Sequence, residues 1–430
     1  MKPVLQVALD VVNAHRALQI AEEAVTGGAD WLEAGTPLIK AEGITVIQKL
    51  AQLGKPVVAD MKTMDVGTME VEMAAKAGAH VVCILGVASD TTVQESITAA
   101  HQYGTKLMVD LIGVTDVTKR AKEVEDMGTD YICVHVSIDD QMVGEQPFAT
   151  IQKVAQDISI PVAAAGGLNS ETVNTAVVNG ASIIIVGGAI IKAEQVNEAT
   201  RVIKQAMSEG ISIATPLFKK YKREDVREAF GKVSTCNICD AMHNQGAMRG
   251  IQQIQPGWNI VGPALTVRTM DGDWAKVVEA IDIASRGEVL VVQAEPGKRA
   301  VWGELATWSS IKKGLAGVVI DGAVRDVDNI RKLEIPVFCR YLISEAGEPK
   351  GYGEIGAEII CGEQYVKPGD WIIGDDSGVV VVPREKAQEV ANRALNVHER
   401  ENRLREEIRR GSSLGRVLEL KKWEKHKTQK

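Results

Sequence analysis

Short apolar runs alternate with helical patterns through the first half of the chain. Amphipathic stretches such as Asn13–Val25, Thr68–Ala77 and Val93–His101 separate most of the runs. Continuous apolar runs this short indicate strands that are buried on both faces, as in a parallel sheet. The eight runs are Val4–Leu9, Trp31–Ala34, Pro56–Asp60, His80–Leu85, Lys106–Leu111, Tyr131–Val136, Ile160–Ala164 and Ser182–Val186.

Eight strand-then-helix units within residues 1–210 predict a (β/α)8 TIM barrel, and a doubly wound open sheet is the competing interpretation. In such a barrel the active site lies at the carboxyl ends of the strands. Charged groups there are expensive to desolvate unless they are paired or bind a metal. Their recurrence after five of the eight strands therefore indicates a site, and the polar residues there are Asp10, Glu33, Asp60, Lys62, Asp110, His135 and Asp139.

The second half of the chain has a different pattern. Residues 211–219 contain Pro and show no clear period, which predicts a linker. From residue 220 short Val/Ile-rich strands and helices mix without the eightfold repeat, and the stretch Arg384–Glu424 is helical and charge-dense. We therefore expect an α/β protein with domains at residues 1–210 and 220–430.

Charge and composition narrow the function classes. A formal net charge of −8 argues against nucleic acid as a partner, so we interpret the lysines at 421–430 as a solvated tail. No apolar run reaches the roughly 18 residues of a membrane span, and the N-terminus lacks a secretory pattern. We expect a cytoplasmic protein with reduced thiols. Cys236, Cys239 and His243 lack the second ligand pair of a structural zinc site.

Two local motifs carry candidate chemistry. In Asp60-x-Lys62-x-x-Asp65, the first two side chains share a face of a strand and stabilise each other's charge, and Asp65 lies in the following loop. Glycine pairs close the last two predicted strands, at the usual phosphate site of such barrels. Backbone N–H groups in these turns bind an anion without a basic side chain. The pairs are Gly166, Gly167, Gly187 and Gly188.

These motifs resemble those of the 3-hexulose-6-phosphate synthase family, within the orotidine-5′-phosphate decarboxylase superfamily. The sibling 3-keto-L-gulonate-6-phosphate decarboxylases are the alternative, but Asp110, Ile138 and Ala165 resemble the synthase choice at the three positions that separate the two. The resemblance rests on Leu5-Gln-Val-Ala-Leu-Asp10, Glu33-Ala-Gly-Thr-Pro37, Asp60-x-Lys62-x-x-Asp65, Val109-Asp-Leu-Ile112, Val134-His-Val136 and Ala165-Gly-Gly167.

The resemblance implies a Mg²⁺-dependent aldol lyase. Glu33 and Asp60 would hold Mg²⁺, which prefers oxygen ligands. His135 would remove a proton from ribulose 5-phosphate, and Lys62 would stabilise the enediolate. Attack on formaldehyde then gives D-arabino-3-hexulose 6-phosphate.

The resemblance also implies that Asp10 and Asp110 belong to the catalytic set. Asp65 would complete the active site of a neighbouring subunit, because family members are dimers with shared sites.

A second constellation lies in the C-terminal half. Twenty residues separate Glu304 from Arg325, and Asp326 follows directly. Arg offers a two-pronged donor for a carboxylate and Asp can hold a metal, so together they predict a site for a 2-keto acid. The surrounding motifs resemble the RraA-like family. They are Gly262-Pro-Ala-Leu-Thr-Val-Arg268, Asp321-Gly-Ala-Val-Arg325-Asp326, Pro336-Val-Phe338, Pro368-Gly-Asp370 and Gly374-Asp-Asp-Ser-Gly378.

This second resemblance implies a layered α/β swivelling domain that is commonly trimeric, and with a dimeric barrel it would give a hexamer. The family contains 4-hydroxy-4-methyl-2-oxoglutarate aldolases and regulators of ribonuclease activity, so an enzymatic and a binding role both stay open. Glu304 stands where the aldolases carry Asp. Its extra methylene displaces the carboxylate, which leaves aldolase turnover an open question.

Overall fold

The computed structural model describes residues 2–418 and 420, and its contacts divide the chain into two compact units. The first contains the residues up to Lys220 together with those from Glu399 onward, and the second contains Tyr221–His398. The pattern of the sequence had placed all of 220–430 in the second domain. The difference arises because the segment after His398 packs on the barrel, a long-range contact that periodicity does not report. The lysines at 421–430 lie outside the described residues.

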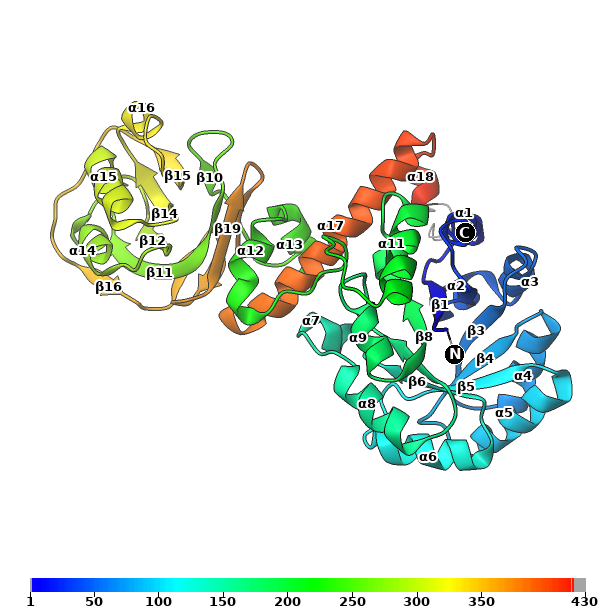
Figure 1. Cartoon of the computed structure of the whole chain (residues 1–430). Coiled ribbons are helices and arrows are strands. Elements are labelled where there is room, and N and C mark those ends of the chain that lie inside the picture. Colours follow the sequence, from blue (N-terminus) through cyan, green and yellow to red (C-terminus); the bar gives the residue numbers. More distant parts are fainter. Residues whose placement is uncertain (1, 419, 421–430) are drawn as a thin grey trace, which may run out of the picture. The chain divides into compact units, whose positions relative to one another are not determined.

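The first unit is a closed barrel of eight parallel strands (Figure 1). Neighbouring strands pair in sequence order, and β1 closes the barrel against β8 with Val4 opposite Ile183. All eight predicted runs form strands, because each offers apolar side chains to the barrel interior and to the surrounding helices. The strands are β1 Val4–Leu9, β2 Trp31–Ala34, β3 Val57–Thr63, β4 Val81–Leu85, β5 Lys106–Asp110, β6 Tyr131–His135, β7 Val162–Ala165 and β8 Ala181–Val186.

Helices surround this barrel, and α1 to α11 each have buried residues that face it, whereas α18 has none. In α1 (Ala14–Thr26) the Asn13 side chain accepts the Arg16 N–H, and the buried residues recur at helical spacing. The others are α2 Thr36–Glu42, α3 Thr45–Ala51, α4 Gly67–Lys76, α5 Asp90–Tyr103, α6 Val117–Met127, α7 Ile138–Met142, α8 Phe148–Asp157, α9 Val173–Val178, α10 Gly188–Ile191, α11 Val196–Glu209 and α18 Leu414–Val417.

The second unit is built around a ten-stranded mixed sheet in the order β10-β15-β14-β12-β11-β19-β20-β9, with β13 paired to β14 and β16 paired to β11 outside this path. Strand β11 is long and runs parallel to β12 over one part and antiparallel to β19 over the other. The strands are β9 Ala247–Met248, β10 Gln252–Gln253, β11 Ile260–Met270, β12 Val289–Glu295, β13 Ala300–Trp302, β14 Gly317–Val324, β15 Val337–Leu342, β16 Gly353–Ile355, β17 Ile359–Cys361, β18 Gln364–Val366, β19 Trp371–Asp375 and β20 Gly378–Val382.

Strand β14 is buried along its whole length, which puts it at the centre of this unit's core. Figure 1 shows that helices α14 and α15 lie beside this sheet. The helices are α12 Val226–Phe230, α13 Thr235–Ala241, α14 Ala275–Ile283, α15 Glu304–Lys313 and α16 Val327–Ile330, with single 3-10 turns at Arg223–Asp225 and Arg384–Lys386.

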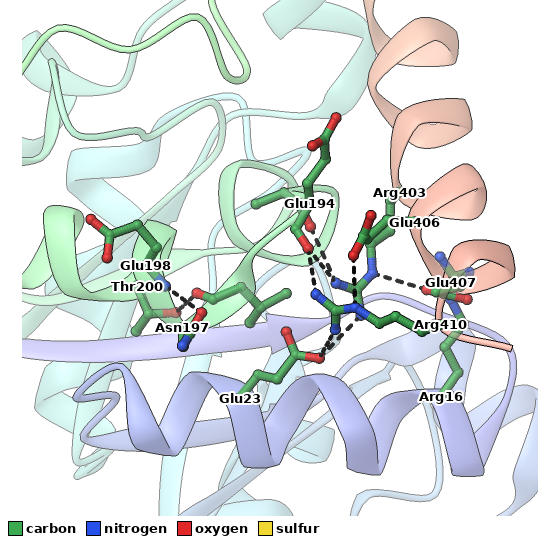
Figure 2. Close-up of polar contacts among 12 residues, drawn as sticks. Arg16, Glu23, Glu194, Asn197, Glu198, Thr200, Arg403, Glu406, Glu407 and Arg410 are labelled. Atoms are coloured by element: carbon green, nitrogen blue, oxygen red, sulfur yellow. Dashed lines mark hydrogen bonds and ion pairs between the residues drawn. The ribbon is translucent and has the colours of Figure 1, made fainter.

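Helix α17 (Ala387–Arg409) is shared, because its residues from Glu399 onward pack with the barrel. Arg403 is 2% exposed and donates to Glu407 at 3.0 Å and to the carbonyl oxygens of Ala193 and Glu194 (Figure 2). Arg16 on α1 bonds the same Glu407 at 2.8 Å. Buried charges are stable only when they are paired in this way, so the network fastens the end of α17 to the barrel. No helix within residues 2–418 and 420 has both the length and the apolar character to cross a membrane.

Candidate active site

The carboxyl ends of the barrel strands bring the predicted ionisable groups together. Asp10 follows β1, Glu33 lies in β2, and Asp60 and Lys62 lie at the end of β3. Asp110 and His135 are the last residues of β5 and β6. Asp10 is exposed as a whole residue although its carboxylate lies against Gly35 and Gly187, whereas Glu33, Asp60 and Asp110 are buried. Five strands thus deliver acids and bases to one end of the barrel, which is where the fold places its chemistry.

Four of these side chains form a continuous chain of contacts. Lys62 Nζ lies 3.2 Å from Asp60 Oδ2 and 2.9 Å from Asp110 Oδ2. The same Asp110 oxygen is 2.8 Å from His135 Nδ1. Asp110 Oδ1 accepts the N–H of Ile112 at 2.9 Å, so this carboxylate is held at both oxygens. The arrangement is a cation between two carboxylates, with an imidazole oriented by one of them.

Lys62 reaches this position through an irregular strand end. Its φ is 49°, in the left-handed region, and the pairing of β3 with β4 shifts register between Asp60 and Thr63. The predicted contact between Asp60 and Lys62 is therefore present, but a local irregularity produces it rather than simple strand alternation. A left-handed residue other than glycine costs about 1–2 kcal/mol, and the two ion pairs of Lys62 offset that cost.

Three carboxylates crowd the β1–β3 side of the mouth. Burial raises the pKa of Glu33 well above its ordinary value, and the nearby charges of Asp60 and Asp10 raise it further. Burial and then the charge of Asp60 likewise raise the pKa of Asp10. Gln6 donates to Glu33 and Thr36 donates to Asp60 at 2.8 Å. Mutual repulsion among buried oxygen ligands is the setting that a hard divalent cation relieves, so the donor set fits Mg²⁺.

Asp110 behaves in the opposite way. Burial by itself would raise its pKa, but the hydrogen bond and charge of His135 and the charge of Lys62 lower it to about 2. Asp110 is therefore anionic at neutral pH and stabilises a positive charge on His135. The site thus contains two carboxylate environments: pKa values are raised at Glu33 and Asp10 and lowered at Asp110.

Sequence reasoning missed the residues beneath these groups. Cys83 and Cys133 are buried next to Asp60 and Asp110, and burial raises the pKa of both thiols, which makes them poor nucleophiles. Gln6 and Thr36, which hold the metal-side acids, were missed as well. Strand alternation could have found Gln6 and Cys133, because each lies two residues from another residue that faces the barrel interior. Thr36 could have been found by its position just after a strand end.

Asp65 does not join this cluster within the chain. Its side chain is exposed and accepts the adjacent Val66 N–H at 2.8 Å. Its predicted contribution to a neighbouring subunit's site stays a prediction. The predicted phosphate glycines follow β7 and β8, where Gly166 and Gly167 have φ of 103° and 70° and form a tight turn. Gly187 and Gly188 follow at the start of α10.

The second predicted constellation also comes together, at the surface of the other unit. Glu304 begins α15, and its backbone N–H donates to Asp326 Oδ2 at 3.2 Å. Arg325 Nε lies 3.3 Å from the same oxygen. Trp308 and Asn329 donate to the two Glu304 oxygens at 3.3 and 3.2 Å. The carboxylate that replaces the expected Asp is thus held by neighbours, and the pair Arg325–Asp326 is half-exposed.

Comparison with known proteins matches the two parts of the chain to two different families. Residues 3–203 match the family model described as orotidine 5′-phosphate decarboxylase / HUMPS family, and residues 235–381 match the RraA-like model, Aldolase/RraA. The chain is 40% identical over 200 residues to 3-hexulose-6-phosphate synthase 2 of Staphylococcus saprophyticus, covering 46% of this chain and 93% of that protein. The chain belongs to the orotidine 5′-phosphate decarboxylase / HUMPS family. It is therefore an enzyme, and an RraA-like region follows its barrel.

Two solved structures are similar to separate parts of the chain. The crystal structure of 3-hexulose-6-phosphate synthase from Salmonella typhimurium is 33% identical, covers 49% of this chain and 100% of its own, and has a TM-score of 0.47. Streptomyces coelicolor RraAS2, described as an unusual member of the RNase ES inhibitor RraA family, is 26% identical and covers 43% of this chain and 96% of its own, with a TM-score of 0.38.

Proposed function

We propose that the barrel is a Mg²⁺-dependent 3-hexulose-6-phosphate synthase, which interconverts ribulose 5-phosphate plus formaldehyde and D-arabino-3-hexulose 6-phosphate. The observation that carries this proposal is the contact chain Lys62–Asp110–His135 beside the crowded acids Glu33 and Asp60. It offers a base, a cation for the developing negative charge and an oxygen-rich metal site. Relatives that carry the synthase name share about 40% of the barrel sequence.

Glu33 and Asp60 would hold Mg²⁺, with Asp10 beside them. When bound, the ion would supply Lewis-acid stabilisation of the negative charge that develops on the sugar. The phosphate would lie at the glycine turns that follow β7 and β8. These contacts fix the sugar with its ketone end toward Lys62.

His135 is the proton carrier in this proposal. Asp110 occupies Nδ1, so Nε2 is the nitrogen that exchanges protons with the substrate. It takes the proton from the carbon next to the ketone, and Asp110 stabilises the resulting imidazolium. Lys62 faces the enediolate oxygen and offsets its charge. The enediolate carbon then forms a bond to formaldehyde, and the imidazolium returns its proton to the new alkoxide.

Formaldehyde consumption by the pure protein with ribulose 5-phosphate tests the proposal. We expect consumption that requires Mg²⁺ and stops with EDTA. Absence of consumption, together with carbon dioxide release from 3-keto-L-gulonate 6-phosphate, would overturn it in favour of the decarboxylase. Ile138, which is 62% exposed at the start of α7, supports the synthase because it offers no cation at this position.

For the RraA-like region we propose binding of a 2-keto acid at Arg325, with Asp326 as a metal ligand. The contact of both Glu304 and Arg325 with one Asp326 oxygen supports this. Pyruvate formation from 4-hydroxy-4-methyl-2-oxoglutarate tests it. A protein that neither turns over nor binds 2-keto acids would instead favour the binding role of ribonuclease regulators.

A further inference from the structure

The predicted linker is part of the barrel unit. Ser170 Oγ donates to the Ile213 carbonyl oxygen at 2.7 Å, and the Ile213 N–H donates back to the Ser170 carbonyl oxygen at 3.0 Å. The Thr215 N–H donates to Glu171 Oε1 at 2.9 Å. Ser170 and Glu171 lie just after the glycine turn that follows β7. The segment that leaves the barrel is therefore hydrogen-bonded next to the glycine turn after β7. This is one of the two turns at which we propose that the phosphate binds.

Phe218 continues this segment to the other turn. A Cβ atom placed on Gly188 would lie only 2.3 Å from the Phe218 ring, so the ring packs directly on the glycine that follows β8. Phe218 has a φ of 56°, and its N–H donates to Glu399 Oε1 at 2.5 Å. Glu399 lies one helical turn before Arg403, the buried residue that anchors the end of α17 (Figure 2). Two segments outside residues 3–203 thus meet at this turn.

Two lysines converge on the Phe218 ring. Lys220 Nζ lies 3.9 Å and Lys192 Nζ 4.9 Å from the ring centroid. Burial lowers the pKa of each to about 8, although the charge of Glu399 acts in the opposite direction on both. The charge of Asp10, at the catalytic end of β1, also acts on Lys192. The charge of Asp10 thus links Lys192 to the catalytic end of β1, and the Phe218 ring links both ammonium groups to the glycine turn after β8.

The charge balance here favours an anion. Lysine side chains normally keep their ammonium groups in water. Lys192 and Lys220 are nevertheless both half-buried here, and the charge of Glu399 acts on both. An aromatic ring face offsets only about 1–2 kcal/mol of such desolvation. A dianionic phosphate would pair with both ammonium groups through charge-assisted hydrogen bonds.

We infer that Lys192 and Lys220, held over Phe218, bind the phosphate of the sugar substrate. The segment after the barrel then supplies a positioning residue, Lys220, to the barrel's own active site. This inference rests on the proposed sugar-phosphate function, and it names a contribution from outside the part of the chain that matches the family model.

Steady-state kinetics of Lys220→Gln in the full-length protein tests the inference, with Lys222→Gln as the matched control. Lys222 is exposed and two residues away, so its loss removes the same charge outside the site. We expect KM for ribulose 5-phosphate to rise about tenfold to a hundredfold in Lys220→Gln, as for loss of a charged hydrogen bond. We expect kcat to change little and the control to match the wild type. An unchanged KM in Lys220→Gln would overturn the inference.

Inorganic phosphate provides a readout that does not depend on turnover. Calorimetric titration should show phosphate binding to the wild type and to Lys222→Gln, and binding at least tenfold weaker in Lys220→Gln and Lys192→Gln. Phe218→Leu keeps an apolar side chain on Gly188 and should weaken binding to a smaller extent. If the wild type consumes no formaldehyde but shows this phosphate pattern, the proposed activity fails and the anion site stands. Equal phosphate binding by all variants would reject the site even in an active enzyme.

Discussion

The two candidate sites use the same residue types in opposite environments. In the barrel, Asp60, Lys62 and Asp110 are mostly buried, and each changes the charge state of its neighbours. In the second unit, the side chains of Arg325 and Asp326 are 43% and 33% exposed, and solvent reaches both. Burial converts a group of charged residues into a coupled unit, whereas solvent leaves each one nearly independent. The comparison predicts large effects of single substitutions in the barrel unit and small ones in the second.

The largest effect is expected at the buried arginine of the barrel unit. Arg403→Ala removes a fully buried cation and, among the described residues, leaves Arg16 as the remaining ion-pair partner of Glu407. Loss of one partner from a buried ion pair costs about 3–5 kcal/mol. Hydrogen exchange should then show faster opening of α1 and α11 in the variant. Arg409→Ala, on the same helix with a side chain that is 70% exposed, is the control and should leave the protection unchanged. Equal protection in both variants would contradict the proposed anchor.

Lys62→Ala should have the next largest effect, on catalysis. Removing a preorganised cation from a charge-developing site lowers kcat by about 10²–10³-fold. The measurement is the initial rate of formaldehyde consumption at saturating Mg²⁺. Lys40→Ala, an exposed lysine on α2, should retain the wild-type rate. A Lys62→Ala enzyme with near-normal kcat would show that the buried ion pairs serve stability alone.

The free energy of unfolding at acidic pH should distinguish Asp110 from an exposed carboxylate. Its pKa of about 2 lies below the ordinary value near 3.9 of an unfolded chain, so its anionic form stabilises the fold above about pH 4. That contribution, about 2–3 kcal/mol, is lost as the pH falls from about 4 to 2. Denaturant unfolding of the wild type and Asp110→Asn should therefore differ most above pH 4 and converge near pH 2. Asp65→Asn should follow the wild type throughout, and parallel curves for Asp110→Asn would rule out the depressed pKa.

The smallest effect on stability is expected at Arg325. An exposed ion pair contributes about 0–1 kcal/mol, so Arg325→Ala should leave the unfolding midpoint and formaldehyde consumption almost unchanged. It should at the same time abolish any 2-keto acid binding, measured by calorimetry with pyruvate. Arg299→Ala, which removes another exposed arginine paired with a glutamate, is the control. Retained pyruvate binding in Arg325→Ala would place the second site elsewhere.

Most of the barrel and of its catalytic set could be predicted from local pattern. The strand ends alone place Asp110 and His135 at one end of the barrel, because parallel strands deliver their carboxyl ends to the same side. Lys62 was predicted in the right place for an incomplete reason, since its left-handed backbone is a local irregularity that no periodicity reports.

The second domain was harder to delimit. The sequence predicted only a mixture of short strands and helices, whereas the structure has β14 running from Gly317 to Val324 and β19 and β20 paired as an antiparallel hairpin. The boundary at 220 is close to the observed division, whereas the return of Glu399 and Arg403 to the barrel unit has no sequence signature. A charged amphipathic helix has the same pattern whether its partner is solvent or a set of buried glutamates.

The sequence by itself determined the class of each unit, the strand-end position of the catalytic groups and the family. These depend on local periodicity and on motifs within one or two elements. Only the tertiary structure decided how those groups are charged, which residues support them, and that Phe218, Lys220 and Glu399 lie beside the turn after β8. Such properties depend on burial and on contacts between residues that are distant in the sequence, 48 positions for Lys62 and Asp110 and 181 for Phe218 and Glu399, and those contacts arise only when the chain folds.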